Sequence, residues 1–324
     1  MKFPYNGKEW YIDGFLASSL DSLAYNVQKD WDFVIMITGD RTVRVGKSVL
    51  AMTVSAYISY ALNKMKMKNE FSVKDIYFDN KAMMKDAFKK PPYHVNQYDE
   101  GREGLAAAKA MKGVQQDLID FFSECGQMNH IFVIVAPDFF KLNEEIAVAR
   151  SEFLINVYRK ETQINKDIFK DGTKRQITKL ERGFFEFFSR KKKQNLYDKS
   201  QSTRRRNYGL IKADFYGSFT NQYPVGEDEY RAKKKDSLER FTKRKEDEKK
   251  LKNQDKFLQQ AIANIKDNNA TYKWKDVQTD LYKLGREMSI EAIKKNYQRY
   301  KLRVSAESEI KAEKLSEGFV MPNA

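Results

Sequence analysis

The sequence predicts an α/β fold with a mostly parallel sheet, followed by a basic, α-rich C-terminal region. Residues 31–38 and 131–136 are short runs dominated by apolar and β-branched residues, which is the pattern of strands buried on both faces of a parallel sheet. Apolar-periodic segments at 16–28 and 49–62 flank the first run and predict helices. Most of the excess positive charge lies after residue 158, so the rear of the chain, more than its front, is where we expect a negatively charged partner to bind.

Composition limits the class of protein and of partner. The chain has 324 residues, 41% of them hydrophobic, which is enough for one large or two modest domains. A net charge of +15 indicates a polyanionic partner. The single cysteine, Cys125, excludes an intramolecular disulfide and a cysteine zinc site, and the presence of just two histidines argues against a histidine metal site. No apolar run reaches transmembrane length and the N-terminus lacks a signal-peptide core, so we expect a soluble, cytoplasmic protein with no membrane partner.

The segment between the first strand and its helix contains Gly46, Lys47 and Ser48. Strand, glycine loop, Gly-Lys-Ser and helix in this order are the context of a phosphate-binding P-loop, or Walker A motif. Glycine lets backbone N–H groups face the phosphates, the lysine reaches the β- and γ-phosphates, and the serine hydroxyl can ligate Mg²⁺. The motif predicts that ATP and Mg²⁺ are bound by Gly39, Gly46, Lys47, Ser48 and Val49.

The loop departs from the pattern G-x-x-x-x-G-K-[ST] at one position. Arg41 stands where the first glycine belongs, and the nearest glycine, Gly39, comes two residues earlier. Either the loop is two residues longer, or its first bend uses a residue other than glycine. The alternative is a chance Gly-Lys-Ser in a surface loop, which the flanking strand and helix disfavour.

Residues 93–98 predict a further strand, which ends in Asp99 and Glu100. A Walker B strand delivers its acids at such a position. Asp99 would hold Mg²⁺, directly or through water, and Glu100 would orient and polarise the attacking water as general base. Two solvated acids at a strand end are the alternative. The strand is more polar than most Walker B strands, since it contains Asn96 and Gln97.

Further candidates flank two later strands. Asp138 follows the strand at 131–136 and is either a sensor of the γ-phosphate or part of a Pro-Asp turn. Arg150 and Arg159 flank a strand at 153–158. Either could be an arginine finger that reaches a neighbouring subunit's nucleotide, with Arg150 taken as the catalytic candidate. Surface salt bridges are the alternative for both.

The order of these parts resembles the additional-strand, catalytic-glutamate division of P-loop NTPases. The resemblance covers about residues 30–160, so we place a P-loop ATPase core at residues 1–160. It is greatest to ATPases of phages and other mobile elements, namely viral genome-packaging ATPases and zonula-occludens-toxin type assembly ATPases. It implies a ring or filament of identical subunits that works on nucleic acid. The residues that match the shared motifs are Gly46, Lys47, Ser48, Asp99 and Glu100.

Residues 161–226 predict a basic extension made of strand and loop. Four phenylalanines at 184–188 suit a strand packed on both faces, and stacking on nucleic-acid bases is the alternative. Two runs of basic residues follow and suit contact with phosphates. The residues expected to contact nucleic acid in this region are Arg190, Lys191, Lys192, Lys193, Arg204, Arg205 and Arg206.

The last third of the chain predicts helices. Residues 227–256 are charged almost throughout, with opposite charges three or four apart, and predict a solvated helical linker or arm. Residues 257–304 predict three helices, the last capped by Ser289, and residues 305–324 a solvated tail. The three helices form either a helix-turn-helix-like module or a generic bundle. The residues expected to contact nucleic acid here are Lys294, Lys295 and Arg299.

Together these features predict an ATP-hydrolysing, DNA-associated motor that packages or translocates DNA for a phage or mobile element, in the host cytoplasm if viral. We expect ATP and Mg²⁺ as cofactors, and DNA and further copies of the chain as partners. One alternative is a replication or segregation factor that binds DNA, uses nucleotide as a switch and turns over little. A small-molecule kinase is disfavoured, because the rear half offers no obvious acceptor pocket.

Overall fold

The computed structural model describes residues 1–39, 45–99, 112–166, 175–269 and 271–317. Glu100 and Arg41 lie outside these ranges. Contacts divide the chain into two compact units, Met1–Ser237 and Leu238–Ala324. In the described ranges, no helix is both long and apolar enough to cross a membrane.

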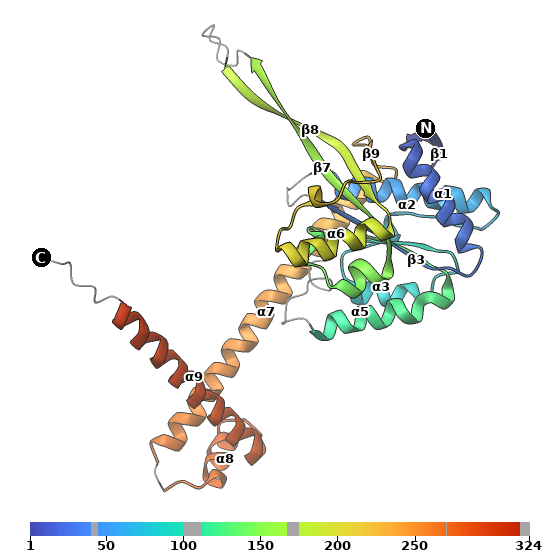
Figure 1. The fold of residues 1–324 in the computed structure, drawn as a ribbon. Coiled ribbons are helices and arrows are strands. Elements are labelled where there is room, and N and C mark those ends of the chain that lie inside the picture. Colours follow the sequence, from blue (N-terminus) through green and yellow to red (C-terminus); the bar gives the residue numbers. More distant parts are fainter. Residues whose placement is uncertain (40–44, 100–111, 167–174, 270, 318–324) are drawn as a thin grey trace, which may run out of the picture. The chain divides into compact units, whose positions relative to one another are not determined.

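The first unit is built on a seven-stranded sheet with the strand order β4-β5-β6-β3-β7-β8-β9 (Figure 1). The first five strands in this order are parallel, whereas β8 is antiparallel to β7 and to β9. The sheet is therefore mostly parallel, as the sequence predicts. The strands are β3 Phe33–Gly39, β4 Ile76–Tyr77, β5 Val95–Tyr98, β6 Ile131–Val135, β7 Ser151–Lys166, β8 Arg175–Phe188 and β9 Phe215–Ser218.

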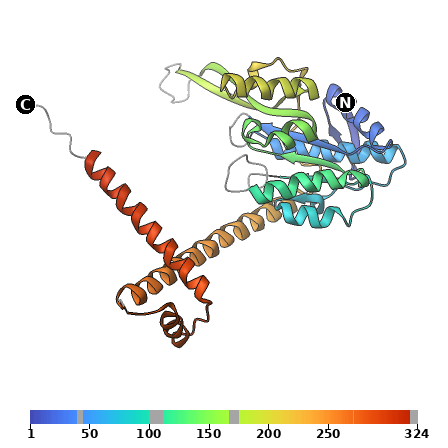
Figure 2. The same ribbon diagram turned by 60° about the horizontal axis from the view of Figure 1, so that its bottom comes forward.

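The central strand β3 is buried along its whole length because helices cover both faces of the sheet. Its side chains alternate between two apolar clusters, with Ile35 and Ile37 in one and Val34 and Met36 in the other. The first cluster packs under α1 and α2 and the second under α3, α5 and α6 (Figures 1 and 2). The helices are α1 Gly14–Val27, α2 Lys47–Lys64, α3 Asn80–Ala87, α5 Lys112–Glu124 and α6 Arg190–Thr203.

β6 lies between β3 and β5 in the sheet. The strand before the Gly-Lys-Ser motif and the strand before Asp99 are thus separated by one inserted strand. This order agrees with the additional-strand organisation that the sequence resembles. Because all three strands are parallel, their carboxyl ends meet at one edge of the sheet, where ligands of open α/β sheets bind.

β7 and β8 form a hairpin that is much longer than the strand expected at 153–158. They stay paired out to Lys166 and Arg175, and Figure 1 shows both strands running beyond the rest of the sheet. Phe185 and Phe188 are fully buried and join opposite apolar clusters, so this part of β8 is packed on both faces, as predicted. The sheet therefore continues through residue 160, where the sequence placed a boundary, and the expected strand and loop extension also contains a helix, α6.

An N-terminal hairpin packs against α2. Its strands are β1 Lys2–Tyr5 and β2 Lys8–Tyr11, joined by Asn6 and Gly7, both with positive φ. Two such residues form the tight turn that two-residue hairpins require. Short turns of tighter or wider helix complete this unit: η1 Val73–Asp75, η3 Cys125–Met128, η4 Phe139–Lys141, η5 Glu145–Arg150 and η6 Tyr208–Leu210.

The second unit consists of helices around a small apolar core. The expected arm at 227–256 and the first expected helix of the bundle are one continuous helix of 41 residues, α7 Glu227–Asp267. α8 Trp274–Lys283 and α9 Ile290–Glu317 follow, and the Ser289 hydroxyl accepts a hydrogen bond from the Ala292 N–H, as an N-cap should. α9 therefore extends through most of the expected tail. The fully buried residues of this core are Ile262, Val277, Leu281 and Ile293.

Candidate nucleotide-binding site

Gly46 begins the site because it stands directly before α2 in a left-handed conformation, with φ 103°. A Cβ atom at this position would lie 2.9 Å from the Phe219 ring, too close for any real contact. Glycine is therefore required for two reasons: the positive φ disfavours any side chain, and a Cβ atom has no room beside Phe219. The N–H groups of the first turn of α2, which includes Val49, open toward this loop, whereas the Val49 side chain is buried in the core.

Gly39 ends β3 and supplies the close approach that Lys47 needs. A Cβ atom on Gly39 would lie 3.0 Å from both Cδ and Nζ of Lys47, and 3.2 Å from the Val157 carbonyl oxygen. The lysine side chain thus folds back over the end of β3. The glycine that faces Lys47 comes two residues earlier than the standard motif has it, so six residues separate the two glycines instead of four.

Ser48 and Asp99 meet across the edge of the sheet. The Ser48 hydroxyl donates a hydrogen bond to Asp99 Oδ1 at 3.1 Å, and Asp99 is fully buried. On the same face of β5, the Ser55 hydroxyl donates to Gln97 Oε1 at 3.3 Å. The polarity of β5 therefore has a structural cause, because alternate side chains face polar residues of α2. Asn96 points to the other face and is also fully buried.

Tyr230, near the start of α7, is a member of the site that the sequence analysis missed. Its hydroxyl donates a hydrogen bond to Asp99 Oδ2 at 2.6 Å. Burial raises the pKa of Tyr230 above its usual range, and the negative charge of Asp99 raises it further, so the hydroxyl keeps its proton. The one sequence signal is an aromatic residue inside the otherwise charged run EDEYRAKKK.

The donor atoms of this site suit a hard cation. A serine hydroxyl and a carboxylate are oxygen ligands of the kind that Mg²⁺ takes, and Mg²⁺ usually completes its shell with waters and nucleotide phosphates. Within the described residues, no group of three or more His, Cys, Asp or Glu side chains converges anywhere. The oxygen donors of Ser48 and Asp99 fit an Mg²⁺ ion bound together with a nucleotide. Glu100, the expected general base, lies outside the described residues.

The candidate arginines stand at opposite edges of the sheet. Arg150 precedes β7 and forms an ion pair of 3.1 Å with Asp32, which precedes β3. Because β3 and β7 are parallel, Arg150 lies at the edge away from the P-loop and cannot reach the nucleotide of its own chain. Arg159 lies two residues beyond Val157, the partner of Gly39 in the sheet, and so stands at the P-loop edge, where it pairs with Glu161.

Asp138 follows β6 at the same edge as Asp99. Its side chain is buried, and Oδ1 accepts a hydrogen bond from the Phe140 N–H at 3.1 Å. This hydrogen bond closes a turn at Pro137-Asp138, which is one of the two roles that the sequence predicts for Asp138. The position beside β5 is the one that a γ-phosphate sensor requires, so the sensor role stays a prediction.

The prediction that Lys193 of α6 contacts nucleic acid is wrong. Its side chain is fully buried, and Nζ donates to Ser151 Oγ, to the Ser151 carbonyl and, at 3.1 Å, to the Val148 carbonyl. Burial lowers the pKa of Lys193 to about 7. This ammonium group faces the interior and cannot contact a phosphate. Of its neighbours, Lys191 is exposed, Arg190 pairs with Glu152, and Lys192 pairs with Asp214.

The other expected basic residues lie on the surface. Arg204, Arg205 and Arg206 follow α6 and are all exposed, as the sequence predicts for a basic loop. Lys294, Lys295 and Arg299 are exposed on α9 of the second unit, where their spacing places them on one side of the helix. These six side chains are accessible to a polyanion.

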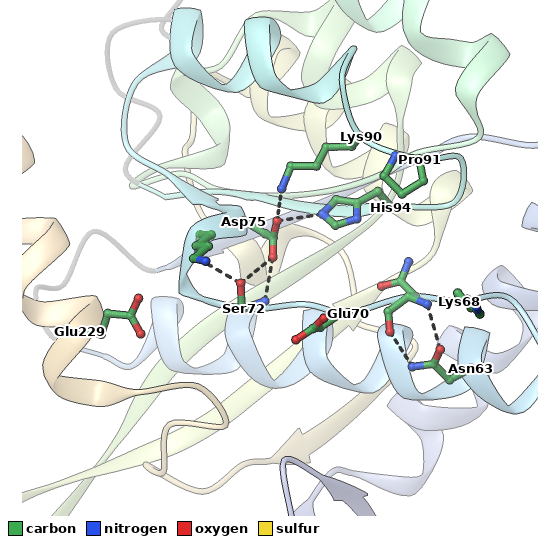
Figure 3. Close-up of a pocket in the computed structure, with 11 residues that line it drawn as sticks. Asn63, Lys68, Glu70, Ser72, Asp75, Lys90, Pro91, His94 and Glu229 are labelled. Carbon is green, nitrogen blue, oxygen red and sulfur yellow. Dashed lines mark hydrogen bonds and ion pairs between the residues drawn. The ribbon is translucent and has the colours of Figure 1, made fainter.

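A separate pocket of about 670 Å³ does not coincide with the nucleotide site. In Figure 3, Asp75 accepts hydrogen bonds from Lys90, at 2.5 Å, and from His94, at 2.8 Å. Asp75 and His94 stand at the amino ends of β4 and β5, whereas the P-loop follows the carboxyl end of β3. Burial alone would raise the pKa of Asp75, but the hydrogen bonds from His94 and Lys90 outweigh it and hold that pKa well below its usual range.

The chain is similar to two solved structures of the genome packaging NTPase B204 from Sulfolobus turreted icosahedral virus 2, one in complex with AMPPCP and one with AMP. The sequence identities are 13% and 14%, and the TM-scores are 0.29 and 0.28. Each comparison covers 50% of this chain and 94% of that chain. No protein-family model matches the chain, and no curated protein sequence matches it. The candidate nucleotide site described above therefore rests on the geometry of this chain itself.

Proposed function

We propose that this protein is an ATP-hydrolysing enzyme whose turnover drives work on DNA, as a packaging or translocating motor of a phage or mobile element. The observation that carries the proposal is the meeting of the two motifs. The Ser48 hydroxyl lies 3.1 Å from the Asp99 carboxylate, while Lys47 folds over Gly39 at the end of β3. Phosphate-binding and metal-binding groups thus converge at one edge of the sheet.

Each residue of the site has a role in this proposal. Lys47 and the N–H groups of the first turn of α2 neutralise the β- and γ-phosphates. Ser48 and Asp99 hold Mg²⁺, which when bound offsets the charge that develops on the phosphates. Glu100 orients and polarises the attacking water. These roles assign in-line hydrolysis of ATP to this site.

An arginine from a neighbouring subunit completes the site in the proposal. Arg159 stands at the P-loop edge and Arg150 at the opposite edge. In a ring or filament, a neighbour could offer either one, so hydrolysis would depend on contacts between subunits. A homo-oligomer is therefore part of the proposed function.

DNA is the proposed partner because exposed basic side chains gather in both units. Arg204 to Arg206 form an exposed run in the first unit, and Lys294, Lys295 and Arg299 an exposed set on α9. Such groups bind the phosphate backbone without reading sequence, and their binding weakens steeply with salt. The proposal therefore includes DNA stimulation of ATP turnover that is strongest at low salt.

One observation favours a second candidate, a DNA-binding factor that uses nucleotide as a switch. Six residues separate Gly39 from Gly46, two more than the standard loop. A longer loop departs from the geometry that positions the γ-phosphate for hydrolysis, which favours nucleotide binding with slow turnover. Replacing Glu100→Gln separates the two functions: a motor loses turnover and keeps nucleotide, whereas a switch is nearly unaffected.

DNA coupling is tested by neutralising the exposed arginines. ATP turnover is compared, with and without double-stranded DNA, between the wild type and a triple variant that carries Arg204→Ala, Arg205→Ala and Arg206→Ala. The expected result is unchanged basal turnover and lost DNA stimulation. The control neutralises three other exposed lysines, Lys81 and Lys85 of α3 and Lys89 just after it, and so removes the same charge elsewhere. Equal loss in both variants would show a general charge effect and contradict a DNA contact at Arg204 to Arg206.

A further inference from the structure

The strongest unexplained contact in the nucleotide site is that between Tyr230 and Asp99. The two residues lie 131 positions apart and are both nearly or fully buried, yet the hydroxyl and the carboxylate meet at 2.6 Å. Binding of phosphate and metal requires no tyrosine at this point. The contact instead links the P-loop edge of the sheet to the start of α7, the helix that leads into the second unit.

The hydrogen bonds at Asp99 fix the orientation of its carboxylate. Oδ1 accepts from Ser48 and Oδ2 accepts from Tyr230, so the group is held at both oxygens. Hydrogen bonds to a charged acceptor are about twice as strong as neutral ones, and two of them on different oxygens restrain rotation of the carboxylate. Ser48 belongs to α2, whereas Tyr230 belongs to α7.

Tyr230 is itself held firmly. Its ring packs between those of Phe78, at 5.9 Å, and Tyr223, at 5.8 Å between centroids. One turn further along α7, Lys233 Nζ donates to the backbone carbonyls of Val73, at 2.8 Å, and Lys74, at 3.1 Å. The first turns of α7 are thus fastened to the segment before β4. A helix held in this way can impose a position on Asp99 and can also be displaced if Asp99 moves.

We propose that Tyr230 is a positioning residue, which holds Asp99 in its metal-binding orientation and makes the first turns of α7 respond to Mg²⁺-nucleotide at the P-loop. The inference rests on the proposed function, because it assigns the regulation of that same site. It adds a route by which the state of the nucleotide reaches α7. No contact of Tyr230 with the nucleotide is needed.

The first test is nucleotide binding with and without Mg²⁺, using a fluorescent ATP analogue as the probe. Tyr230→Phe removes the hydroxyl and keeps the ring, and Tyr223→Phe is the matched control from the same aromatic cluster. Without Mg²⁺, we expect all three proteins to bind within about twofold of one another, because the Tyr230 hydroxyl bonds Asp99, which in the proposal holds the metal and not the phosphates. With Mg²⁺, the gain in affinity should be smaller in Tyr230→Phe by about tenfold, which corresponds to one charge-assisted hydrogen bond.

The second test follows hydrogen exchange of residues 227–237 in the full chain. In the wild type and in Tyr223→Phe, adding Mg²⁺ and the analogue should slow exchange at the first turns of α7. Tyr230→Phe should lose that response. If Tyr230→Phe does not fold, the same exchange is measured in Lys233→Met. This variant removes the hydrogen bonds that hold the first turns of α7 and keeps the Tyr230 hydroxyl. The response should then fall by at least half.

The outcomes separate the inference from the function on which it rests. If Tyr230→Phe keeps both the Mg²⁺ gain and the exchange response of the wild type, Tyr230 has no positioning role, although the nucleotide site stands. If the wild type itself fails to bind the analogue, the nucleotide site falls and the inference with it. A uniform loss of affinity with and without Mg²⁺ in Tyr230→Phe would show a purely structural role and would also overturn the inference.

Discussion

The Ser48 hydroxyl donates a hydrogen bond to the Asp99 carboxylate across 51 residues of sequence, at 3.1 Å. Ser48 is the second residue of α2 and Asp99 directly follows β5, and the inserted strand β6 separates β5 from β3. Because Asp99 is fully buried, its negative charge is held inside the fold, where it attracts cations more strongly than it would in water. The arrangement brings the residues of the two sequence motifs into direct contact.

Gly46→Ala should damage both stability and nucleotide binding. The left-handed backbone disfavours a side chain, and the new Cβ would press on the Phe219 ring at 2.9 Å. We expect the free energy of unfolding to fall by about 1–3 kcal/mol in urea titrations. Adding Phe219→Ala should not restore nucleotide binding, because the backbone strain remains. The control, Gly14→Ala, has open space around it and should be nearly neutral. Full activity of Gly46→Ala would contradict the assigned geometry.

Gly39→Ala tests the longer loop. The new Cβ would meet Cδ and Nζ of Lys47 at 3.0 Å and the Val157 carbonyl at 3.2 Å. Lys47 must move aside and the carbonyl can give little, so we expect affinity for a fluorescent ATP analogue to fall by about tenfold and the melting temperature to fall as well. Unchanged affinity would mean that the close approach of Gly39 to Lys47 has no part in nucleotide binding.

Arg159 and Arg150 should behave differently when each is replaced by alanine. Arg159 stands at the P-loop edge, so its loss should lower kcat at least tenfold with little change in nucleotide affinity if it serves a neighbouring subunit. Arg150 pairs with Asp32 at the other edge, so its loss should lower stability by about 1 kcal/mol and leave kcat within twofold. The reverse pattern would make Arg150 the finger.

Lys193→Met should leave DNA affinity unchanged, whereas Lys191→Met should lower it and reduce the salt dependence by about one ion. The reason is that Lys193 is buried and Lys191 is exposed. The pKa of Lys193 is about 7 in the folded protein and near 10.5 when unfolded. Between these values the unfolded chain binds the extra proton, so this group makes stability rise with pH from about 7 to 10. Lys193→Met should lose that rise relative to wild type, as measured by urea unfolding at several pH values.

The Asp75 cluster should make the protein sensitive to acid. Its pKa is held below the ordinary aspartate value, so its contribution to stability is fully present above about pH 4 and is lost as the pH falls through the lowered pKa. Asp75→Asn should cost roughly 1–3 kcal/mol at pH 7 and should flatten the stability curve below pH 4. Asp117→Asn, at an exposed position, is the control. A parallel acid curve for wild type and Asp75→Asn would contradict this role.

The sequence was most informative where burial is complete. β3 and β6 are continuous apolar runs, and the structure places them near their predicted positions. The outer half of β7 could not be foreseen, because it is paired with β8 but largely exposed and so carries no apolar pattern. Hydrogen bonding alone defines those residues as a strand.

The candidate site shows the same division. Local motifs indicated Lys47, Ser48 and Asp99, whereas Tyr230 reaches Asp99 only through the tertiary fold. Lys193 was misassigned because a run of four basic residues was treated as surface. On α6 it belongs to the buried stripe that continues with Leu196, Tyr197 and Ser200, a helical spacing that is visible once the segment is known to be a helix.

The most direct test of the proposed motor function is steady-state ATP hydrolysis at low salt, with and without double-stranded DNA, for the wild type and Lys47→Ala. Lys64→Ala, at the other end of the same helix, is the matched control. We expect turnover that DNA stimulates, that Lys47→Ala abolishes and that Lys64→Ala keeps. Turnover of the wild type no greater than that of Lys47→Ala would contradict it.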